Sequence, residues 1–314
     1  MPDPTLVTVP NLPPNLECYQ TANAGRAVRT TFKIPRSTTI FAEEPHSFTV
    51  HYRHRSKVCD HCFRFSSSSR EMPFPCASSC GVHYCTPACM EAALPRHARA
   101  CPLLLQLNSK KGPKVPASQR TSLSLALSVA SSREPVEPVL EMMRDLSKPG
   151  MKAAAQAEKT LRSLNHGGGA TPPLLPQGVY AEALLSAKYN AIGMYDECGT
   201  EVGFCLSPAL AMVNHSCLPN CCQTTTGGRA RLVALRDIEA GEELSYSYAS
   251  IEGTTATRRA SIESTWGFRC LCARCEGTAD CGAFDEEHVC YCGAVCVSVE
   301  RGKGSCVCNP GWKG

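Results

Sequence analysis

Residues 214–221 read Asn214-His215-Ser216-Cys217-Leu218-Pro219-Asn220-Cys221, and this stretch says more about the fold than any other part of the chain. Twenty residues later comes Gly241-Glu242-Glu243-Leu244-Ser245-Tyr246-Ser247-Tyr248, followed by Cys270-x-Cys272-x-x-Cys275. Three dense and unlike segments in one order rarely arise by chance. They indicate a built site that combines polar, aromatic and metal-ligating side chains.

Upstream of this stretch, cysteine and histidine recur in closely spaced pairs. The residues are Cys59, Cys62, Cys76, Cys80, Cys85, Cys89, His97 and Cys101. The chain holds 22 cysteines, and its first thirty residues lack the basic and apolar regions of a secretory signal, so thiolate ligands in a reducing compartment are favoured over a disulfide scaffold. Zinc fits best because it takes tetrahedral sulfur and nitrogen ligands without redox chemistry.

The order and content of these segments resemble the SMYD family, in which a MYND zinc finger is inserted inside a split SET domain. The resemblance covers roughly residues 17 to 275. It implies an α+β protein with a β-rich, pseudoknotted SET fold, a helical insert, an inserted MYND finger and a Cys-rich post-SET zinc region. Threading of the chain in such a fold is a rare exception to the usual rules of topology.

The resemblance divides the chain into five parts. They are residues 17–56, the N-terminal part of the split SET domain; 57–101, the finger; 120–192, the helical insert; 193–250, the C-terminal SET core; and 251–314, the post-SET region. Hydrophobic periodicity predicts helices over about 120–131, 136–147, 151–164 and 178–190. Short strands are expected within 26–45, at 230–235 and at 244–248. β patterns otherwise return only from 203 onward.

The bulk composition fits a globular protein. The 314 residues are long enough for two domains, and 43% hydrophobic content is enough for a core. The longest mostly apolar stretch, 122–130, is too short to span a bilayer. We therefore expect a nuclear and/or cytoplasmic protein without a membrane partner. The end at Gly314 leaves open whether the sequence is a fragment that lacks a C-terminal helical domain.

Charge is unevenly distributed along the chain. Residues 51–120 carry eleven Lys and Arg against three Asp and Glu, although the whole chain has a net charge of only +4. A basic finger beside a mildly acidic remainder predicts weak, non-specific contact with nucleic acid and an acidic surface for a basic peptide. A solvated charged surface is the alternative for any one of these residues.

By the resemblance, the finger binds two zinc ions in a cross-brace. Cys59, Cys62, Cys85 and Cys89 would hold one ion, and Cys76, Cys80, His97 and Cys101 the other. Three residues separate Cys76 from Cys80 where the family usually has two, so His83 is the alternative ligand. Cys217, Cys270, Cys272 and Cys275 would form a third site. Whether the segment from Cys281 to Cys308 binds a fourth ion is left open.

The resemblance also implies a site for S-adenosylmethionine. Gly25-Arg26-Ala27-Val28 resembles the family's Gly-x-Gly-Leu turn, with Ala27 in place of the second glycine. Cofactor contacts are expected from Gly25, Arg26, Asn190, Asn214, His215 and Phe268, of which Phe268 would stack on adenine. His215 in a metal-rich protein has a ligand role as its alternative.

Tyr248 matches the catalytic tyrosine of the family, and Tyr246 would line the substrate channel. Trp266 falls where many members have tyrosine, so the number of methyl groups added is left open. The expected function is methyl transfer from S-adenosylmethionine to a lysine of a histone or non-histone protein. The alternatives are a catalytically weak adaptor that recruits Pro-rich partners in transcriptional regulation, and nucleic-acid binding as the main activity. The substrate, its lysine and the oligomeric state are not predicted.

Overall fold

The computed structural model describes residues 5–9, 12–21, 25–66, 71–109, 112–132, 134–142, 150–164, 175–195, 200–226 and 228–278. It divides into two units. Unit 1 comprises Met1–Glu43, Ala209–Thr224 and Ala230–Gly314, and unit 2 comprises Glu44–Pro208 and Thr225–Arg229. The predicted Cys-rich tail from Cys281 to Cys308 lies outside the described residues. Within these residues, no helix combines the length and the apolar character that a membrane span requires.

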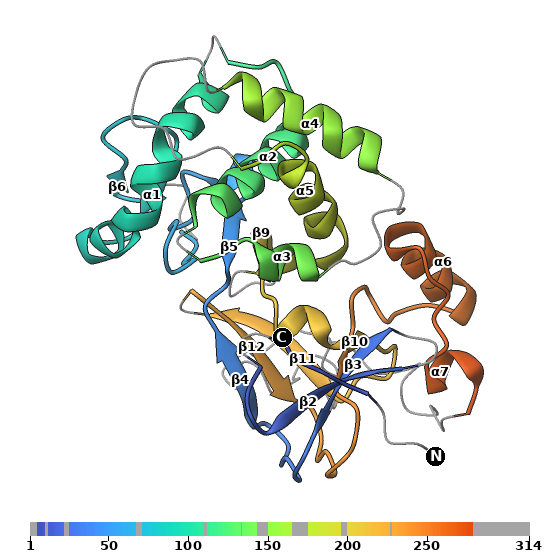
Figure 1. The fold of residues 1–314 in the computed structure, drawn as a ribbon. Coiled ribbons are helices and arrows are strands. Elements are labelled where there is room, and N and C mark those ends of the chain that lie inside the picture. Colours follow the sequence, from blue (N-terminus) through green and yellow to red (C-terminus); the bar gives the residue numbers. More distant parts are fainter. Residues whose placement is uncertain are drawn as a thin grey trace. The chain divides into compact units, whose positions relative to one another are not determined.

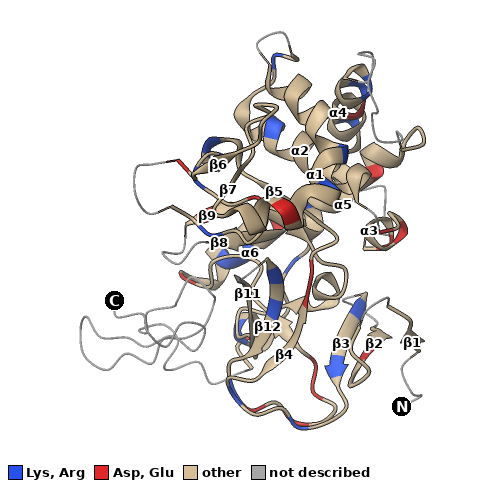
Figure 2. Ribbon diagram, turned by 90° about the vertical axis from the view of Figure 1, so that its left-hand side faces the viewer, with Lys and Arg blue, Asp and Glu red and all other residues tan. Residues whose placement is uncertain are grey.

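Unit 1 begins with an antiparallel sheet in the order β1-β2-β3, formed by β1 (Leu6–Val7), β2 (Leu16–Gln20) and β3 (Arg26–Thr30). Figure 1 shows β2 and β3 side by side. Leu16 and Cys18 are buried, as the alternation of a half-buried strand requires. Glu17 and Arg29 face each other across the pair, 2.8 Å apart, and Figure 2 shows the opposite charges on these strands.

A second sheet of unit 1 joins segments that are far apart in sequence. Its order is β11-β12-β4, with β4 (Thr39–Glu43) antiparallel to β12 (Arg229–Ala234) and β11 (Cys221–Thr226) at the other edge. After the 3-10 helix η2 (Leu210–Met212), β10 (Asn214–His215) pairs in parallel with β13 (Ser245–Tyr246). The predicted strand 244–248 is therefore shorter than expected, because only two of its residues pair.

Two helices complete the described part of unit 1. They are α6 (Thr255–Trp266) and α7 (Ala273–Glu276). The Thr254 side chain accepts a hydrogen bond from the Thr257 amide and so caps the start of α6, and Gly267 ends it in the left-handed conformation, φ 77°. Ile262 of α6 packs with Ile251, Cys217, Cys270 and Cys275 in a small core.

Unit 2 contains a three-stranded antiparallel sheet in the order β5-β9-β8, made of β5 (Ser47–Val50), β9 (Glu201–Leu206) and β8 (Ile192–Tyr195). The return of β structure thus begins at Ile192, earlier than the predicted residue 203. Gly203 is required here, since a Cβ atom at this position would collide with the Thr49 carbonyl oxygen on the adjacent strand.

The helices of unit 2 form its main core. They are α1 (Pro87–Asn108), α2 (Ala117–Ser131), α3 (Glu137–Glu141), α4 (Met151–Ser163) and α5 (Val179–Asn190), together with the 3-10 helix η1 (Tyr52–His54) and the short strands β6 (Phe74–Pro75) and β7 (His83–Tyr84). Leu107, Leu123, Leu161 and Tyr180, one from each of four helices, are almost fully buried in one cluster. Helices α2, α4 and α5 match their predicted ranges closely, whereas α3 ends at Glu141 and residues 143–149 lie outside the description.

A buried carboxylate joins α4 to α5. Glu158 is only 6% exposed, and its oxygens accept hydrogen bonds from the Gly178 amide at 2.9 Å and the Ala181 amide at 3.3 Å. Arg162 pairs with the same carboxylate one turn later in α4. The negative charge therefore lies at the amino end of α5, where the helix dipole favours it.

We predict that Glu158→Ala destabilises the protein by about 2–4 kcal/mol, because two backbone amides and a guanidinium lose their buried acceptor. Urea unfolding followed by circular dichroism measures this change. The matched control is Lys159→Ala, which removes an exposed neighbour on the same helix and should change stability by less than about 0.5 kcal/mol. Equal stability of the two variants would contradict the role of Glu158.

Candidate functional site

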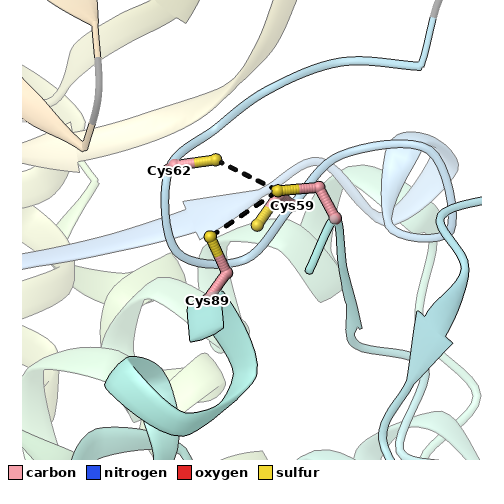
Figure 3. A group of neighbouring side chains, drawn as sticks. Cys59, Cys62 and Cys89 are labelled. Atoms are coloured by element: carbon pink, nitrogen blue, oxygen red, sulfur yellow. Dashed lines mark hydrogen bonds between the residues drawn. The ribbon is translucent and has the colours of Figure 1, made fainter. Parts of the chain in front are cut away.

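The first metal-ligating cluster of unit 2 consists of Cys59, Cys62, Cys85 and Cys89, whose sulfur atoms lie within 4.8 Å of one another. Cys59 and Cys62 lie on one loop, whereas Cys89 belongs to the first turn of α1, and Figure 3 shows these sulfurs pointing toward one another. The Thr86 side chain caps this turn by accepting from the Cys89 amide at 3.1 Å. Local helix capping thus fixes the position of one ligand.

The second cluster contains Cys76, Cys80, His97 and Cys101, also within 4.8 Å. His97 and Cys101 are four residues apart on α1 and therefore share one face of the helix. His97 Nε2 lies 3.1 Å from Cys76 Sγ and 3.7 Å from Cys80 Sγ. The alternative ligand His83 instead has its Nδ1 3.3 Å from the Gly81 carbonyl oxygen. Cys80, and not His83, belongs to the cluster.

Each cluster of the finger combines alternate Cys or His pairs, as the predicted cross-brace requires. Arg96 of α1 stabilises the loop between Cys59 and Cys62. Its guanidinium donates to the Asp60 carbonyl oxygen at 2.6 Å and to the Asp60 carboxylate at 2.7 Å. The same guanidinium lies 4.0 Å from the centroid of the Phe48 ring. Arg96 therefore connects the finger to the β5 strand of unit 2.

The third cluster lies in unit 1 and contains Cys217, Cys270, Cys272 and Cys275. Cys217 Sγ is 3.9 Å from Cys270 Sγ and 3.7 Å from Cys275 Sγ. The Cys217 amide donates to Cys272 Sγ at 3.4 Å. The cluster joins the end of the Asn214–Cys217 segment to the chain that follows α6.

Cationic groups surround this third cluster. Arg258 Nη2 lies 3.9 Å from Cys275 Sγ, Arg259 Nε donates to the Cys270 carbonyl oxygen at 3.0 Å, and Arg274 Nη1 donates to the carbonyl oxygens of Cys217 and Ile251. Four thiolates around one divalent cation carry a net negative charge, so nearby guanidinium groups stabilise that arrangement. No local sequence pattern marks these arginines, because their role depends on the tertiary fold.

The donor chemistry of all three clusters fits zinc. Four sulfur donors, or three sulfurs and an imidazole nitrogen, are the ligand sets of structural zinc sites. Their atoms are close enough to share one ion, and the ligand sets agree with those the sequence predicted. Zinc bound at these positions would contribute to folding, since the unfolded chain has no preformed site.

Hydrogen bonds fix both the side-chain hydroxyl and the backbone of Tyr248. Its hydroxyl donates to the Val213 carbonyl oxygen at 2.8 Å, and its backbone N–H donates to His215 Nδ1 at 3.1 Å. The rings of Tyr246 and Trp266 lie 5.0 and 5.6 Å from the Tyr248 ring. Burial, with a smaller contribution from the negative charge of Glu243, raises the pKa of Tyr248 above its usual value. The phenol is therefore neutral near pH 7.

His215 contacts a member of the third cluster, because its Nε2 lies 3.2 Å from Cys217 Sγ. Burial lowers the pKa of His215 to about 4, so the imidazole is neutral near pH 7. Its ring is also 5.3 Å from Tyr248 and 6.4 Å from Phe268. The predicted polar motif, the aromatic residues and the cysteine cluster thus meet at one side chain.

Asn214 is oriented by two acceptors. Its Nδ2 donates to the Arg26 carbonyl oxygen at 3.0 Å and to Glu243 Oε1 at 3.1 Å. Both amide hydrogens are then used, and among the described residues no donor contacts the amide oxygen, which can accept from a ligand. Glu243 also accepts from the Tyr19 hydroxyl at 3.3 Å, and burial followed by the charge of Glu243 raises the pKa of Tyr19.

Asn220 fixes the neighbouring backbone. Its Nδ2 donates to the Glu243 carbonyl oxygen at 2.7 Å and to Glu242 Oε1 at 3.1 Å, and its Oδ1 accepts from the Ser245 amide at 2.8 Å. Tyr19, Asn220 and Glu243 were absent from the predicted site residues. Asn220 and Glu243 lie inside the two quoted motifs, and that position was the available signal.

Of the other residues predicted to contact the cofactor, Gly25 and Phe268 belong to unit 1 and Asn190 to unit 2. Gly25 has φ +70°, which favours glycine, and the space beyond it is open. Ala27 is fully buried in β3 opposite Tyr19, and its φ is not positive, so a second glycine is not needed for the backbone here. Phe268 is 38% exposed. Asn190 belongs to unit 2, where its side chain donates to the Ser186 carbonyl oxygen at 3.0 Å.

We predict that Cys275→Ser removes one equivalent of zinc from the purified full chain, because the third cluster loses a thiolate while both finger clusters keep all their ligands. Inductively coupled plasma mass spectrometry gives the count. The control is Cys222→Ser, which replaces a buried thiol outside the three clusters and should leave the zinc content of the wild type. An unchanged count in Cys275→Ser would refute the third site.

The chain is similar in sequence to known proteins. The SET domain family model matches residues 25–249. The "Histone-lysine N-methyltransferase SMYD3" of Mus musculus is 28% identical over 269 residues, which cover 83% of this chain and 61% of that protein. The "SET domain and MYND-type zinc finger protein 6" of Schizosaccharomyces pombe is 25% identical over 80% of this chain and 50% of that protein. The chain thus spans about half to three-fifths of the length of these relatives.

Among solved structures, the "Crystal structure of the SET domain of LSMT bound to Lysine and AdoHcy" aligns with 84% of this chain and 54% of that chain, at 9% identity and a TM-score of 0.38. This likeness is distant. The family model, by contrast, covers well over half of the chain, and both quoted motifs fall within it. The chain therefore belongs to the SET domain family, and it is homologous to the SMYD proteins.

Proposed function

We propose that this chain is a protein-lysine N-methyltransferase that uses S-adenosylmethionine. The observation that carries the proposal is the placement of Tyr248, whose backbone and hydroxyl are both fixed beside Asn214 and His215. The names of the relatives, which describe histone-lysine and N-lysine methyltransferases, support the same reaction. A protein that had lost the reaction would have no need to keep this arrangement.

The residues of unit 1 suit the cofactor. The Asn214 amide oxygen is oriented to accept from its ammonium group, since both amide hydrogens are held by Arg26 and Glu243. The positive φ and open surroundings of Gly25 allow a ligand to approach the backbone. Phe268 offers an exposed ring for an adenine. When bound, S-adenosylmethionine supplies an activated methyl group, so the protein contributes chiefly orientation and electrostatics.

Tyr248 would act through position and polarity. Its neutral phenol presents an oxygen with lone pairs while its proton is directed at the Val213 carbonyl oxygen. Tyr246 and Trp266 pack around the same ring. An apolar aromatic wall disfavours the ammonium form of an entering lysine and so favours the neutral amine that reacts. Trp266 contributes no hydroxyl to this wall, which leaves fewer polar partners for a methylated amine.

We further propose a histone or non-histone protein as substrate, and a nuclear and/or cytoplasmic location. A Pro-rich partner is supported by Met90 and Leu94 of α1, which are 38% and 56% exposed next to the ligand Cys89. The excess of Lys and Arg over residues 51–120 supports weak, non-specific nucleic-acid contact. Such contact would weaken steeply with salt and show no sequence preference.

The proposal is tested by methyl transfer from labelled S-adenosylmethionine to core histones and to a cell lysate. We predict label on lysine with the wild type and a loss of about 100-fold or more with Tyr248→Phe, because the fixed hydroxyl is removed from the reacting groups. Tyr52→Phe, in an exposed residue of unit 2, should retain activity. Absence of label from folded, zinc-loaded wild type would favour the adaptor function instead.

We predict that Glu243→Ala weakens cofactor binding about tenfold, because Asn214 and Tyr19 lose the acceptor that orients them. Isothermal titration calorimetry with S-adenosylhomocysteine measures the affinity. Glu239→Ala, which removes an exposed partner of Lys33, serves as the control and should bind with wild-type affinity. Wild-type affinity in Glu243→Ala would show that Asn214 is positioned without it.

A further inference from the structure

The imidazole of His215 makes one contact on each side. Nδ1 lies 3.1 Å from the backbone nitrogen of Tyr248, and Nε2 lies 3.2 Å from Cys217 Sγ. Tyr248 is the proposed catalytic residue, whereas Cys217 is a ligand in the third cysteine cluster. One ring therefore spans the distance between the active tyrosine and the metal-ligating thiolates.

The two contacts determine the tautomer of the ring. A backbone N–H can only donate, so Nδ1 must accept the hydrogen bond from Tyr248. Because Nδ1 accepts, the ring carries its proton on Nε2, which lies 3.2 Å from Cys217 Sγ. A metal-bound thiolate is a better acceptor for this proton than a free thiol, because it carries negative charge. The protonation and metal binding of Cys217 would therefore bear on the orientation of His215.

Other contacts leave this ring few ways to relax. The Tyr248 hydroxyl donates to the Val213 carbonyl oxygen. The Cys217 backbone amide donates a hydrogen bond to Cys272 Sγ. The Tyr248 and Phe268 rings lie beside the imidazole. Parallel pairing of Asn214–His215 with Ser245–Tyr246 fixes the backbone on either side. Movement of Cys217 therefore moves the acceptor of the Tyr248 amide.

We propose that His215 is a positioning residue that couples the Cys217-Cys270-Cys272-Cys275 zinc centre to the backbone of Tyr248. With zinc bound to the centre, Cys217 would be a thiolate that accepts from His215 Nε2–H, and the ring would then present Nδ1 to the Tyr248 amide. The inference rests on the proposed function for the role of Tyr248, but the coupling itself is a property of the fold.

Amide hydrogen exchange of Tyr248 tests the coupling without any assay of activity. The full, zinc-loaded chain is labelled with ¹⁵N-tyrosine, which marks nine residues, and the Tyr248 signal is the one that is missing in Tyr248→Phe. We predict that exchange at Tyr248 becomes about tenfold faster or more in both His215→Phe and Cys275→Ser. The first variant removes the acceptor directly, and the second removes the zinc ion without touching His215.

The matched control is Cys89→Ser, which empties a finger site in unit 2 and should leave Tyr248 exchange at the wild-type rate. Wild-type exchange in Cys275→Ser, or equal acceleration by Cys89→Ser, would overturn the proposal. If Cys275→Ser does not fold, the absorption spectrum of His215→Phe loaded with Co²⁺ tests the contact between His215 and Cys217 instead. Loss of the Nε2–H contact should shift the sulfur-to-cobalt charge-transfer band relative to wild type, and an unshifted band would refute the contact.

The two proposals fail separately. A chain that transfers no methyl group, yet shows the predicted exchange rates, would refute the enzyme and leave the coupling intact. A chain that methylates lysine but keeps wild-type Tyr248 exchange in Cys275→Ser would refute the coupling alone. His215→Gln adds a rescue, because its amide has both an acceptor and a donor. It should return the exchange rate part of the way toward wild type, and a rate no slower than in His215→Phe would count against a hydrogen-bonding role.

Discussion

The parallel pairing of Asn214–His215 with Ser245–Tyr246 is the constraint on which the site depends. Two residues on each side provide too few backbone hydrogen bonds to hold such a pair alone. Side-chain hydrogen bonds supply the remaining stabilisation of this pair. Asn214 and Asn220 are both anchored on Glu243, one through its carboxylate and the other through its carbonyl oxygen. Replacing these polar groups by apolar ones would leave buried backbone groups without partners.

The three cysteine clusters bring together segments that these short strands do not join. The third cluster ties Cys217, directly after β10, to the segment that follows α6. Both finger clusters draw ligands from α1, a helix that continues past the last ligand to Asn108. The Asn108 side chain donates to the Cys80 carbonyl oxygen at 2.9 Å, so the helix supports the finger beyond its own ligands. Zinc bound in either unit would therefore contribute to folding.

The proposed active site combines a neutral, oriented polar set with an aromatic enclosure. Burial keeps Tyr248 protonated and His215 neutral, so neither is set up to exchange a proton near pH 7. Such a site suits a reaction that needs alignment more than acid or base catalysis. The four-thiolate cluster is a strongly charged feature nearby, where Arg258 Nη2 lies 3.9 Å from Cys275 Sγ and His215 Nε2 lies 3.2 Å from Cys217 Sγ.

Hydrophobic periodicity was enough to predict the α2, α4 and α5 helices, because it is read along the chain. The resemblance carried by motif order led to the three ligand sets, whose atoms the structure brings together, while the catalytic role of Tyr248 stays a prediction. Tertiary structure decided that Tyr19 reaches Glu243 across 224 residues, that Asn190 lies in unit 2, and that His215 links Cys217 to Tyr248. These contacts depend on strand register and side-chain direction. Both are set by packing between distant segments, and spacing along the chain does not encode them.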